Sequence, residues 1–398
     1  MTSITPSETR PGWILPTIIF SQFAGTSLWF AGNAVLADLQ HQWGLPAGAL
    51  GYMTSAVQFG FIAGTLAFAV LAISDRFSPR LVFFACSLLG ALANLAVYIA
   101  DGYTALLALR LLTGFFLAGI YPVGMKIATG WYRSDLGNAL GFLVGALVLG
   151  TAFPHLIKGL GQTLPWETVL LAVSVLAACG GGLMLLLVPD GPHLAQGAKF
   201  DPKALVVVFR SRSFRASAFG YFGHMWELYA FWAFVPFILA AHLAHHGSSG
   251  INVSVWAFVI IAAGSVGCAG GGLISLRAGS APVAFAQLAA SGLCCALSPL
   301  FFYAPTRAFL AFLVLWGIVV VGDSPQFSAL NARNAPREWV GSALTVGNCI
   351  GFAITIVSIQ LLNYCAGFLA AQYLLLLLTP GPILGLLALR ALLRPPPA

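Results

Sequence analysis

The clearest shortage in this sequence is of charged side chains. Asp, Glu, Lys and Arg make up 7% of its 398 residues, whereas a soluble domain carries roughly 25%. A chain with so few charges cannot cover a water-exposed surface, and its mean hydropathy is +0.92. The composition therefore excludes a soluble enzyme, a disordered chain and a nucleic-acid-binding module. It indicates a protein whose surroundings are mostly lipid.

Signals for cofactors and cross-links are also missing. The seven cysteines lie in or beside apolar runs, without zinc-ligand spacing or a disulfide pattern. There is no Gly-x-x-x-x-Gly-Lys-Ser/Thr motif for ATP. We therefore expect no cofactor and no resident metal. His242, His245 and His246 have a spacing that can hold a metal, but no Cys or carboxylate accompanies them, so we interpret them as part of a solvated outer loop.

Twelve apolar segments are long enough to cross a bilayer, which takes about 20 residues. They lie near 12–37, 48–72, 81–99, 104–129, 138–160, 167–188, 214–241, 252–276, 282–303, 306–328, 339–362 and 369–392. The first runs on to Val35, beyond the short apolar region of a cleavable signal, so we expect it to be retained. The predicted fold class is an all-α membrane protein with twelve transmembrane helices.

The basic residues are distributed unequally between the two sides of these spans. Lys158 and Arg307 fall in one set of connections, Arg110 and Lys126 fall within spans, and fourteen fall in the other set of loops and tails. The fourteen are Arg10, Arg76, Arg80, Arg133, Lys199, Lys203, Arg210, Arg212, Arg215, Arg277, Arg333, Arg337, Arg390 and Arg394. This asymmetry follows the positive-inside rule. It predicts that both termini are cytoplasmic and that the partner is a lipid bilayer rather than a nucleic acid.

A polar segment at 189–213 divides the spans into two sets of six. Trp29 and Trp232 are 203 residues apart, and so are Pro122 and Pro325. These matches indicate a duplicated unit, with an N-terminal six-helix bundle at 1–188, a cytoplasmic linker at 189–213 and a C-terminal bundle at 214–398. Parallel repeats of this kind are typical of transporters, whose substrate site lies near the bilayer midplane between the halves.

Local motifs then point to one family. The loop Ser74-Asp75-Arg76-Phe77-Ser78-Pro79-Arg80 is similar to an Asp-Arg-x-Gly-Arg motif, with Ser78 in place of Gly. Arg110 and Gly114 match an Arg-x-x-x-Gly motif. Through these motifs and its topology, the whole chain resembles the major facilitator superfamily, with its two pseudo-symmetric six-helix bundles. Within this superfamily, small-anion permeases of the cyanate type are a candidate group of relatives.

The resemblance also bears on gating and direction. Asp75, Arg76 and Arg80 are expected to form a cytoplasmic gate of ion pairs, although a positive-inside loop with an incidental acid is the alternative. The glycines at 141, 145 and 150 resemble the glycine motif of family antiporters, but Ala146 replaces its proline. That departure favours uptake or exchange over drug efflux. Pro122 and Pro325 are predicted to kink spans 4 and 10 and to serve gating.

Charges within the spans are the candidate functional groups, because an idle charge in lipid costs roughly 2.5–3.5 kcal/mol. His224 and Glu227 are i, i+3 neighbours on span 7. They are candidates for proton coupling, or else a hydrogen-bonded pair that fixes helix packing. Asp323 is a candidate relay that can instead pair with Arg333. Arg110 is a candidate for binding an anion, and the resemblance gives it a competing structural or proton-coupling role.

Other candidates complete a cavity between the halves. His155 is expected to serve the anion together with Arg110. The aromatic and polar members of the expected cavity wall are Trp29, Tyr121, Tyr221, Trp226 and Asn348. For each of these residues a helix-packing role is the alternative.

These observations predict a secondary transporter rather than an enzyme. We expect a monomer in a bacterial inner membrane that moves a small organic or inorganic anion by alternating access, coupled to protons. The alternative is a proton-driven efflux pump for amphipathic compounds, because aromatic residues form 13% of the chain. A membrane enzyme acting on lipid-linked substrates ranks lowest, since it would need acids at an interface rather than within spans.

Overall fold

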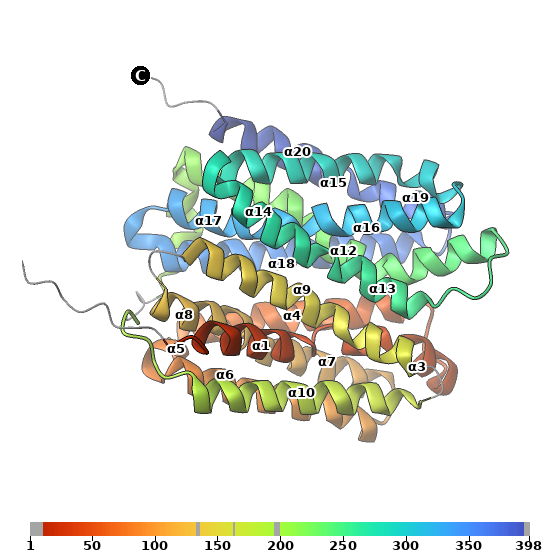
Figure 1. Ribbon diagram of the computed structural model, residues 1–398, viewed down its shortest axis with the longest axis horizontal. Helices are drawn as coiled ribbons and strands as arrows, with labels where there is room; N and C mark the ends of the chain where they lie inside the picture. The colour runs from red at the N-terminus through yellow and green to blue at the C-terminus, as the bar shows by residue number, and fades with distance from the viewer. Residues whose placement is uncertain (1–10, 133–135, 162–163, 195–199, 394–398) are drawn as a thin grey trace, which may run out of the picture.

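The computed structural model describes residues 11–132, 136–161, 164–194 and 200–393. Within these ranges all regular structure is helical, and no strand occurs. This is expected of apolar runs in lipid, where a helix satisfies its own backbone hydrogen bonds. Figure 1 shows the helices lying roughly side by side in two groups, one formed by the first half of the chain and one by the second.

The helices of the first half succeed one another with short connections. They are α1 (Ile14–Thr26), α2 (Ala31–Ala34), α3 (Leu36–Trp43), α4 (Ala49–Val70), α5 (Ile73–Arg76), α6 (Pro79–Leu95), η1 (Ala96–Ile99), α7 (Tyr103–Leu117), α8 (Tyr121–Trp131), α9 (Leu136–Leu160) and α10 (Trp166–Leu187).

The second half begins with two short elements in the polar segment. Its helices are α11 (Ala204–Val207), η2 (Val208–Arg210), α12 (Arg212–His245), α13 (Val253–Ala262), α14 (Gly264–Ala278), α15 (Ser280–Phe302), α16 (Thr306–Gly322), α17 (Ser324–Asn334), η3 (Arg337–Trp339), α18 (Val340–Cys365), α19 (Ala371–Leu374), η4 (Leu375–Leu378), α20 (Pro380–Leu389) and η5 (Arg390–Leu392).

The first predicted span is interrupted, while the others are long helices. Eleven helical stretches of the described chain have the length and hydropathy to cross a membrane. The twelfth, predicted near 12–37, is divided into α1, α2 and α3, because residues 27–30 and Val35 form turns. The guanidinium of Arg110 accounts for the break locally. It donates to the carbonyl oxygens of Leu28 and Trp29, which an unbroken helix would use internally.

Two prolines interrupt equivalent helices of the two halves, as the sequence predicts. α7 ends at Leu117 and α8 begins at Tyr121, with Pro122 in its first turn. α16 ends at Gly322 and α17 begins at Ser324, with Pro325 in its first turn. Proline fits the first turn because the amide hydrogen it lacks has no partner there.

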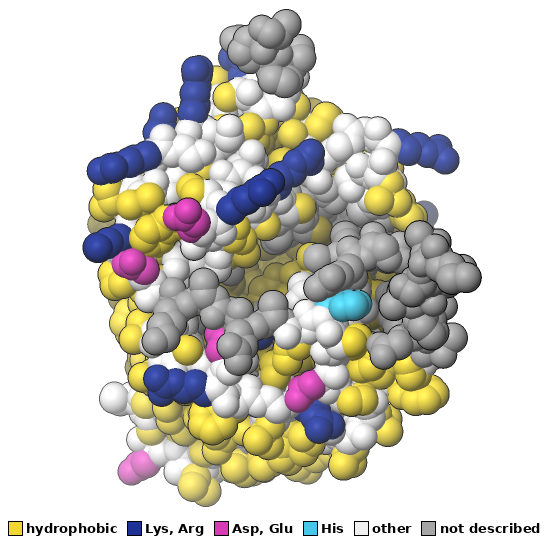
Figure 2. Space-filling model, turned by 90° about the vertical axis from the view of Figure 1, so that its left-hand side faces the viewer, with side chains coloured by type: hydrophobic (Ala, Val, Ile, Leu, Met, Phe, Trp, Pro, Cys, Tyr) yellow, Lys and Arg dark blue, Asp and Glu magenta, His cyan; other side chains and the backbone are white. Residues whose placement is uncertain are grey.

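One end of the molecule carries most of the basic side chains, and we call it the basic end. Ten of the fourteen predicted positions are described, and they lie at helix ends or in connections on this side. Figure 2 looks onto this face and shows exposed Lys and Arg around a central hollow. Arg10, Arg133, Lys199 and Arg394 lie outside the described residues.

The two halves meet tightly at the opposite end, which we call the closed end. α18 packs against α4, and α13 packs against the end of α9, where Gly159 contacts Val255. The side-chain amide of Gln360 donates to Ser55 Oγ at 2.8 Å, and that of Asn252 donates to the carbonyl of Gly159 at 2.8 Å. Hydrogen bonds therefore join the halves at this end.

Candidate functional site

A cavity of about 670 Å³ lies between the two halves. Residues of α4, α8 and α9 line one side, and residues of α12, α16, α17 and α18 line the other. A cavity shared by both halves is where a transporter of two repeats places its substrate site. Of the predicted site residues, the lining includes Tyr121, Pro122, Tyr221 and Asn348.

The cavity wall combines hydroxyl and amide groups with two cations. Tyr221 Oη lies 3.4 Å from Asn348 Oδ1, which joins α12 to α18. Lys126 of α8 and Arg333 of α17 line the side toward the basic end. Lys126 forms an ion pair with Asp75. Arg333 has an exposed side chain and makes no ion pair within the described part of the chain.

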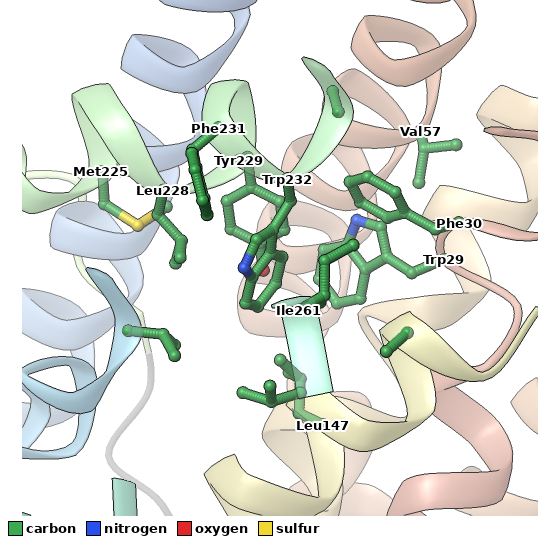
Figure 3. Close-up of a cluster of buried hydrophobic side chains, with 14 of the residues drawn as sticks. Trp29, Phe30, Val57, Leu147, Met225, Leu228, Tyr229, Phe231, Trp232 and Ile261 are labelled. Atoms are coloured by element: carbon green, nitrogen blue, oxygen red, sulfur yellow. The ribbon is translucent and has the colours of Figure 1, made fainter. Parts of the chain in front are cut away.

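Aromatic side chains close the cavity toward the other end. Trp29 of the first half stacks on Tyr229 and Phe352 of the second, with ring centroids 5.6 and 5.7 Å apart. Phe61 lies 4.4 Å from Phe352 by the same measure. Figure 3 shows Trp29 and Phe30 facing Tyr229 and Trp232 of α12. Because Tyr229 and Phe352 also line the cavity, this aromatic layer forms its floor.

Three ionisable side chains are buried beside the cavity in the second half. His224 Nδ1 of α12 lies 2.8 Å from Asp323 Oδ1, where α16 gives way to α17, and both side chains are fully buried. Glu227 lies one turn beyond His224. Its Oε2 accepts hydrogen bonds from Ser291 Oγ at 2.8 Å and from Cys295 Sγ at 3.2 Å.

This arrangement differs from two pairings that the sequence leaves open as alternatives. The spacing of His224 and Glu227 favours a pair on one helix, but the histidine instead meets Asp323 of another helix. Asp323 therefore does not pair with Arg333, whose side chain extends to the cavity and the basic end. The physical reason is that Pro325 restarts the helix at Ser324, which leaves Asp323 at the break facing α12.

Arg110 lies away from the described cavity lining, contrary to a role in binding the anion there. Its side chain is 1% exposed. It donates to Asn94 Oδ1 at 3.0 Å, to the Leu28 carbonyl at 3.0 Å and to the Trp29 carbonyl at 2.7 Å. These contacts stabilise the interrupted first span next to Trp29.

Two further candidates lie outside the cavity wall. His155 of α9 is 2% exposed, and its side chain is absent from the described lining. Trp226 of α12 donates from Nε1 to the carbonyl of Leu377 at 3.3 Å. It therefore faces η4 and α20, on the side of α12 away from Tyr221. Successive residues of a helix are rotated by about 100° around its axis, so sequence neighbours such as Met225 and Trp226 point in different directions.

The three predicted gate residues make different kinds of contact. Asp75 pairs with Lys126 of α8 rather than with Arg76 or Arg80, so this ion pair joins α5 to α8 within the first half. Arg80 donates to the carbonyl of Leu185 at 3.3 Å, and Arg76 is exposed. Because α6 and α7 lie between α5 and α8 in the chain, the order of the sequence does not show that α5 and α8 are neighbours.

Two of the outer histidines, His242 and His245, belong to the last turn of α12, and His246 caps the helix. His242 is fully buried, with Nδ1 2.9 Å from the Phe302 carbonyl and its ring stacked on Phe309 at 4.2 Å. The prediction of a solvated loop is therefore wrong for His242, whereas His245 and His246 are exposed. No group of side chains suited to a metal occurs among the described residues.

Sequence reasoning missed the cavity cations and the partners of Glu227. From the sequence, Arg333 is a topological charge or a partner of Asp323, and Lys126 is a cation within a span, whereas in the structure both line the cavity. Ser291 and Cys295 of α15 are small residues in an apolar run, and nothing in the sequence connects them to α12.

Comparisons with known proteins agree with this architecture. A probable galactarate/D-glucarate transporter of Bacillus subtilis is 27% identical over 44% of this chain and 40% of its own. A D-galactonate transporter of Escherichia coli is 25% identical over 40% of this chain and 37% of its own. A 4-hydroxybenzoate transporter of Pseudomonas aeruginosa is 29% identical over 38% of this chain and 34% of its own. The chain thus matches less than half the length of these relatives.

A similarity to a solved structure shows the fold, and a match to a family model shows the family. The structure of the human organic anion transporter MFSD10 (TETRAN) superposes with a TM-score of 0.68, covering 96% of this chain and 100% of that one at 15% identity. The family model for the Major Facilitator Superfamily matches residues 18–359. The family match shows that the chain belongs to the major facilitator superfamily, and the eleven long apolar helices of its described residues show an integral membrane protein.

Proposed function

We propose that this chain is a proton-coupled secondary transporter for a small organic carboxylate. The observation that carries the proposal is the cavity between the halves, which contains the guanidinium of Arg333 without an acidic partner in the described chain. A planar guanidinium binds a carboxylate through two parallel hydrogen bonds. Galactarate, galactonate and 4-hydroxybenzoate, which name three relatives, are all carboxylates.

The remaining wall suits the other end of such a solute. Tyr121, Tyr221 and Asn348 offer hydroxyl and amide groups for a hydroxylated chain. Tyr229 and Phe352 offer ring faces for an aromatic one. A cavity of about 670 Å³ has room for either.

Alternating access follows from the way the two ends of the cavity differ. By the positive-inside rule the basic end is cytoplasmic, and so are both termini. The cavity would then face the cytoplasm, with the aromatic layer closing the outer side. We propose that residues 1–188 and 214–398 rock against each other about α9, whose Gly145 lies against Ser265 of α14. We propose that the transporter is a monomer in the plasma membrane.

The buried acids are the proposed coupling groups. The contact of His224 with Asp323 ties α12 to the start of α17, two elements of the cavity wall. A proton taken up by the carboxylate cancels its charge and weakens that tie, so proton binding and helix arrangement become linked. Glu227 is a second proton acceptor one turn away, held by Ser291 and Cys295.

The test is solute and proton flux in proteoliposomes. Purified protein is reconstituted with a lumenal pH indicator, and galactarate, galactonate, 4-hydroxybenzoate and a cationic control solute are added in turn. We expect one or more carboxylates, but not the cation, to drive a lumenal pH change. Asp323→Asn and Glu227→Gln should lose the pH change while keeping solute exchange. Asp101→Asn, an exposed acid at the closed end, is the matched control.

Two results would overturn parts of the proposal separately. If Asp323→Asn and Glu227→Gln move protons with solute as well as wild type does, the coupling site lies elsewhere. If Arg333→Gln transports the carboxylates at the wild-type rate, the anion is not bound by this guanidinium. Removal of a charged hydrogen bond to a substrate costs about 1.5–3 kcal/mol, so we expect a roughly 10- to 100-fold rise in KM.

A further inference from the structure

A second cavity, of about 1150 Å³, opens at the basic end within the second half alone. The start of α12, the connection between α14 and α15, the end of α17 and the end of α20 with η5 surround it. Its polar lining comprises Arg212, Ser213, Ser280, Arg333, Asn334 and Arg390. It is separate from the substrate cavity, with which it shares only Arg333 among the described lining residues.

The charge of this cavity is unbalanced. Three guanidinium groups line it, and its described lining contains no acidic residue. Arg212, Arg333 and Arg390 are exposed, and none makes an ion pair or side-chain hydrogen bond with the described residues. The positive-inside rule explains basic residues at this end but not their convergence. Arg210 and Arg337 lie at the same end and do not line the cavity.

The cavity also reaches the outer surface of the helix bundle. Leu387 of α20 lines it and is 57% exposed. Ile383 and Leu384, on the same exposed stripe of α20, are 50% and 65% exposed. Such leucine-rich faces are the parts of a membrane protein that contact acyl chains. Positive charge therefore meets exposed apolar surface at this end, and Figure 2 shows Lys and Arg side chains beside hydrophobic ones on the basic face.

We propose that this cavity binds the phosphate of an anionic glycerophospholipid. Arg212 and Arg390 hold the phosphate, and the serine and asparagine side chains contact the glycerol or headgroup hydroxyls. Arginine suits phosphate because its planar fork donates two hydrogen bonds at once. Basic pockets between helix ends on the cytoplasmic side are sites where anionic headgroups bind. The bound lipid would join α12 to α20 and support the second half.

The experiment measures lipid binding to the purified full-length protein in detergent. Phosphatidylglycerol, phosphatidylcholine and inorganic phosphate are titrated separately, and bound lipid and the unfolding midpoint are both recorded. We expect phosphatidylglycerol to bind and to raise the midpoint more than phosphatidylcholine or inorganic phosphate does. Each cationic residue near the membrane surface contributes enough to change affinity about fivefold. Arg212→Gln and Arg390→Gln should therefore each weaken phosphatidylglycerol binding about fivefold, and the double variant more.

The matched control is the double variant Arg210→Gln/Arg337→Gln, which removes the same charge from the same end outside the cavity. Arg333 is left unchanged because it also lines the substrate cavity. If the control loses as much binding as Arg212→Gln/Arg390→Gln, the attraction belongs to the whole face and the proposal is wrong. Equal stabilisation by inorganic phosphate would make this a free-phosphate site and would also overturn it. The single variants keep the test decisive if the double variant unfolds.

Discussion

At the residue scale, a buried arginine and an exposed one perform opposite tasks. Arg110 satisfies Asn94 and the carbonyls of Leu28 and Trp29, all within the first half. Arg333 reaches into the cavity without an acidic partner in the described chain. A buried charge whose terminal nitrogens are hydrogen-bonded within the fold serves structure, whereas one that faces a cavity is available to a ligand.

Replacing Arg110 by Leu should therefore destabilise the fold. Each buried acceptor left without a donor costs roughly 1–3 kcal/mol. We expect a clear drop in the unfolding midpoint of the purified protein, measured in detergent. Arg333→Gln is the control and should shift stability by at most about 0.5 kcal/mol, as is usual for an exposed side chain. Equal loss in both variants would show that Arg110 is not a brace.

The sequence could predict that buried charges matter, but not their partners. A charge without a role is costly in lipid. The sequence alone therefore marks four residues as candidate functional groups: Arg110, His224, Glu227 and Asp323. Their pairings depend on which helices become neighbours. Asp323 meets His224 of α12, about 100 residues earlier in the chain, and Glu227 meets Ser291 of α15. No periodicity within one span encodes such contacts.

At the element scale, small residues let helices approach closely. α4 and α7 cross where Gly60 faces the backbone of Leu111 and Gly114 faces the backbone of Val57. A methyl group at either glycine would overlap a carbonyl oxygen of the other helix. Association of helices in lipid relies on such close packing because no hydrophobic force drives it.

The substitution Gly114→Ala should accordingly push α7 away from α4. Overpacking of this kind costs about 1–3 kcal/mol. We expect a lower unfolding midpoint and a lower yield of folded protein after extraction. Gly182→Ala in α10 is the control, since an added methyl there meets nothing within 4 Å. A midpoint for Gly114→Ala at or above that of Gly182→Ala would argue against a tight crossing.

At the scale of the whole molecule, the proposed transport cycle requires the closed end to open. Gln360 of α18 and Ser55 of α4 touch across the halves there. A short thiol-specific cross-link between Ser55→Cys and Gln360→Cys should therefore fix the cavity facing the basic end and abolish carboxylate flux. Cleaving the cross-link with a reductant should restore flux.

The control for that experiment is a link within one half. Asn33 of α2 donates to Thr54 of α4 at 2.8 Å, and both belong to the first half. Asn33→Cys/Thr54→Cys, treated identically, should retain flux, and so should the parent chain with its seven native cysteines. Full transport by the cross-linked Ser55–Gln360 variant would mean that the halves do not separate at this end.

The sequence by itself determined the solvent, the number of spans and the asymmetry of charge. These properties depend on the hydropathy of contiguous segments, because each helix crosses lipid according to its own length and composition. Only the tertiary structure decided which side chains face the cavity between the halves. It brought Lys126 and Arg333 to that cavity and turned Trp226 and Arg110 away from it. The reason is that helix rotation and pairing depend on packing between segments far apart in the chain, which a single-segment pattern does not contain.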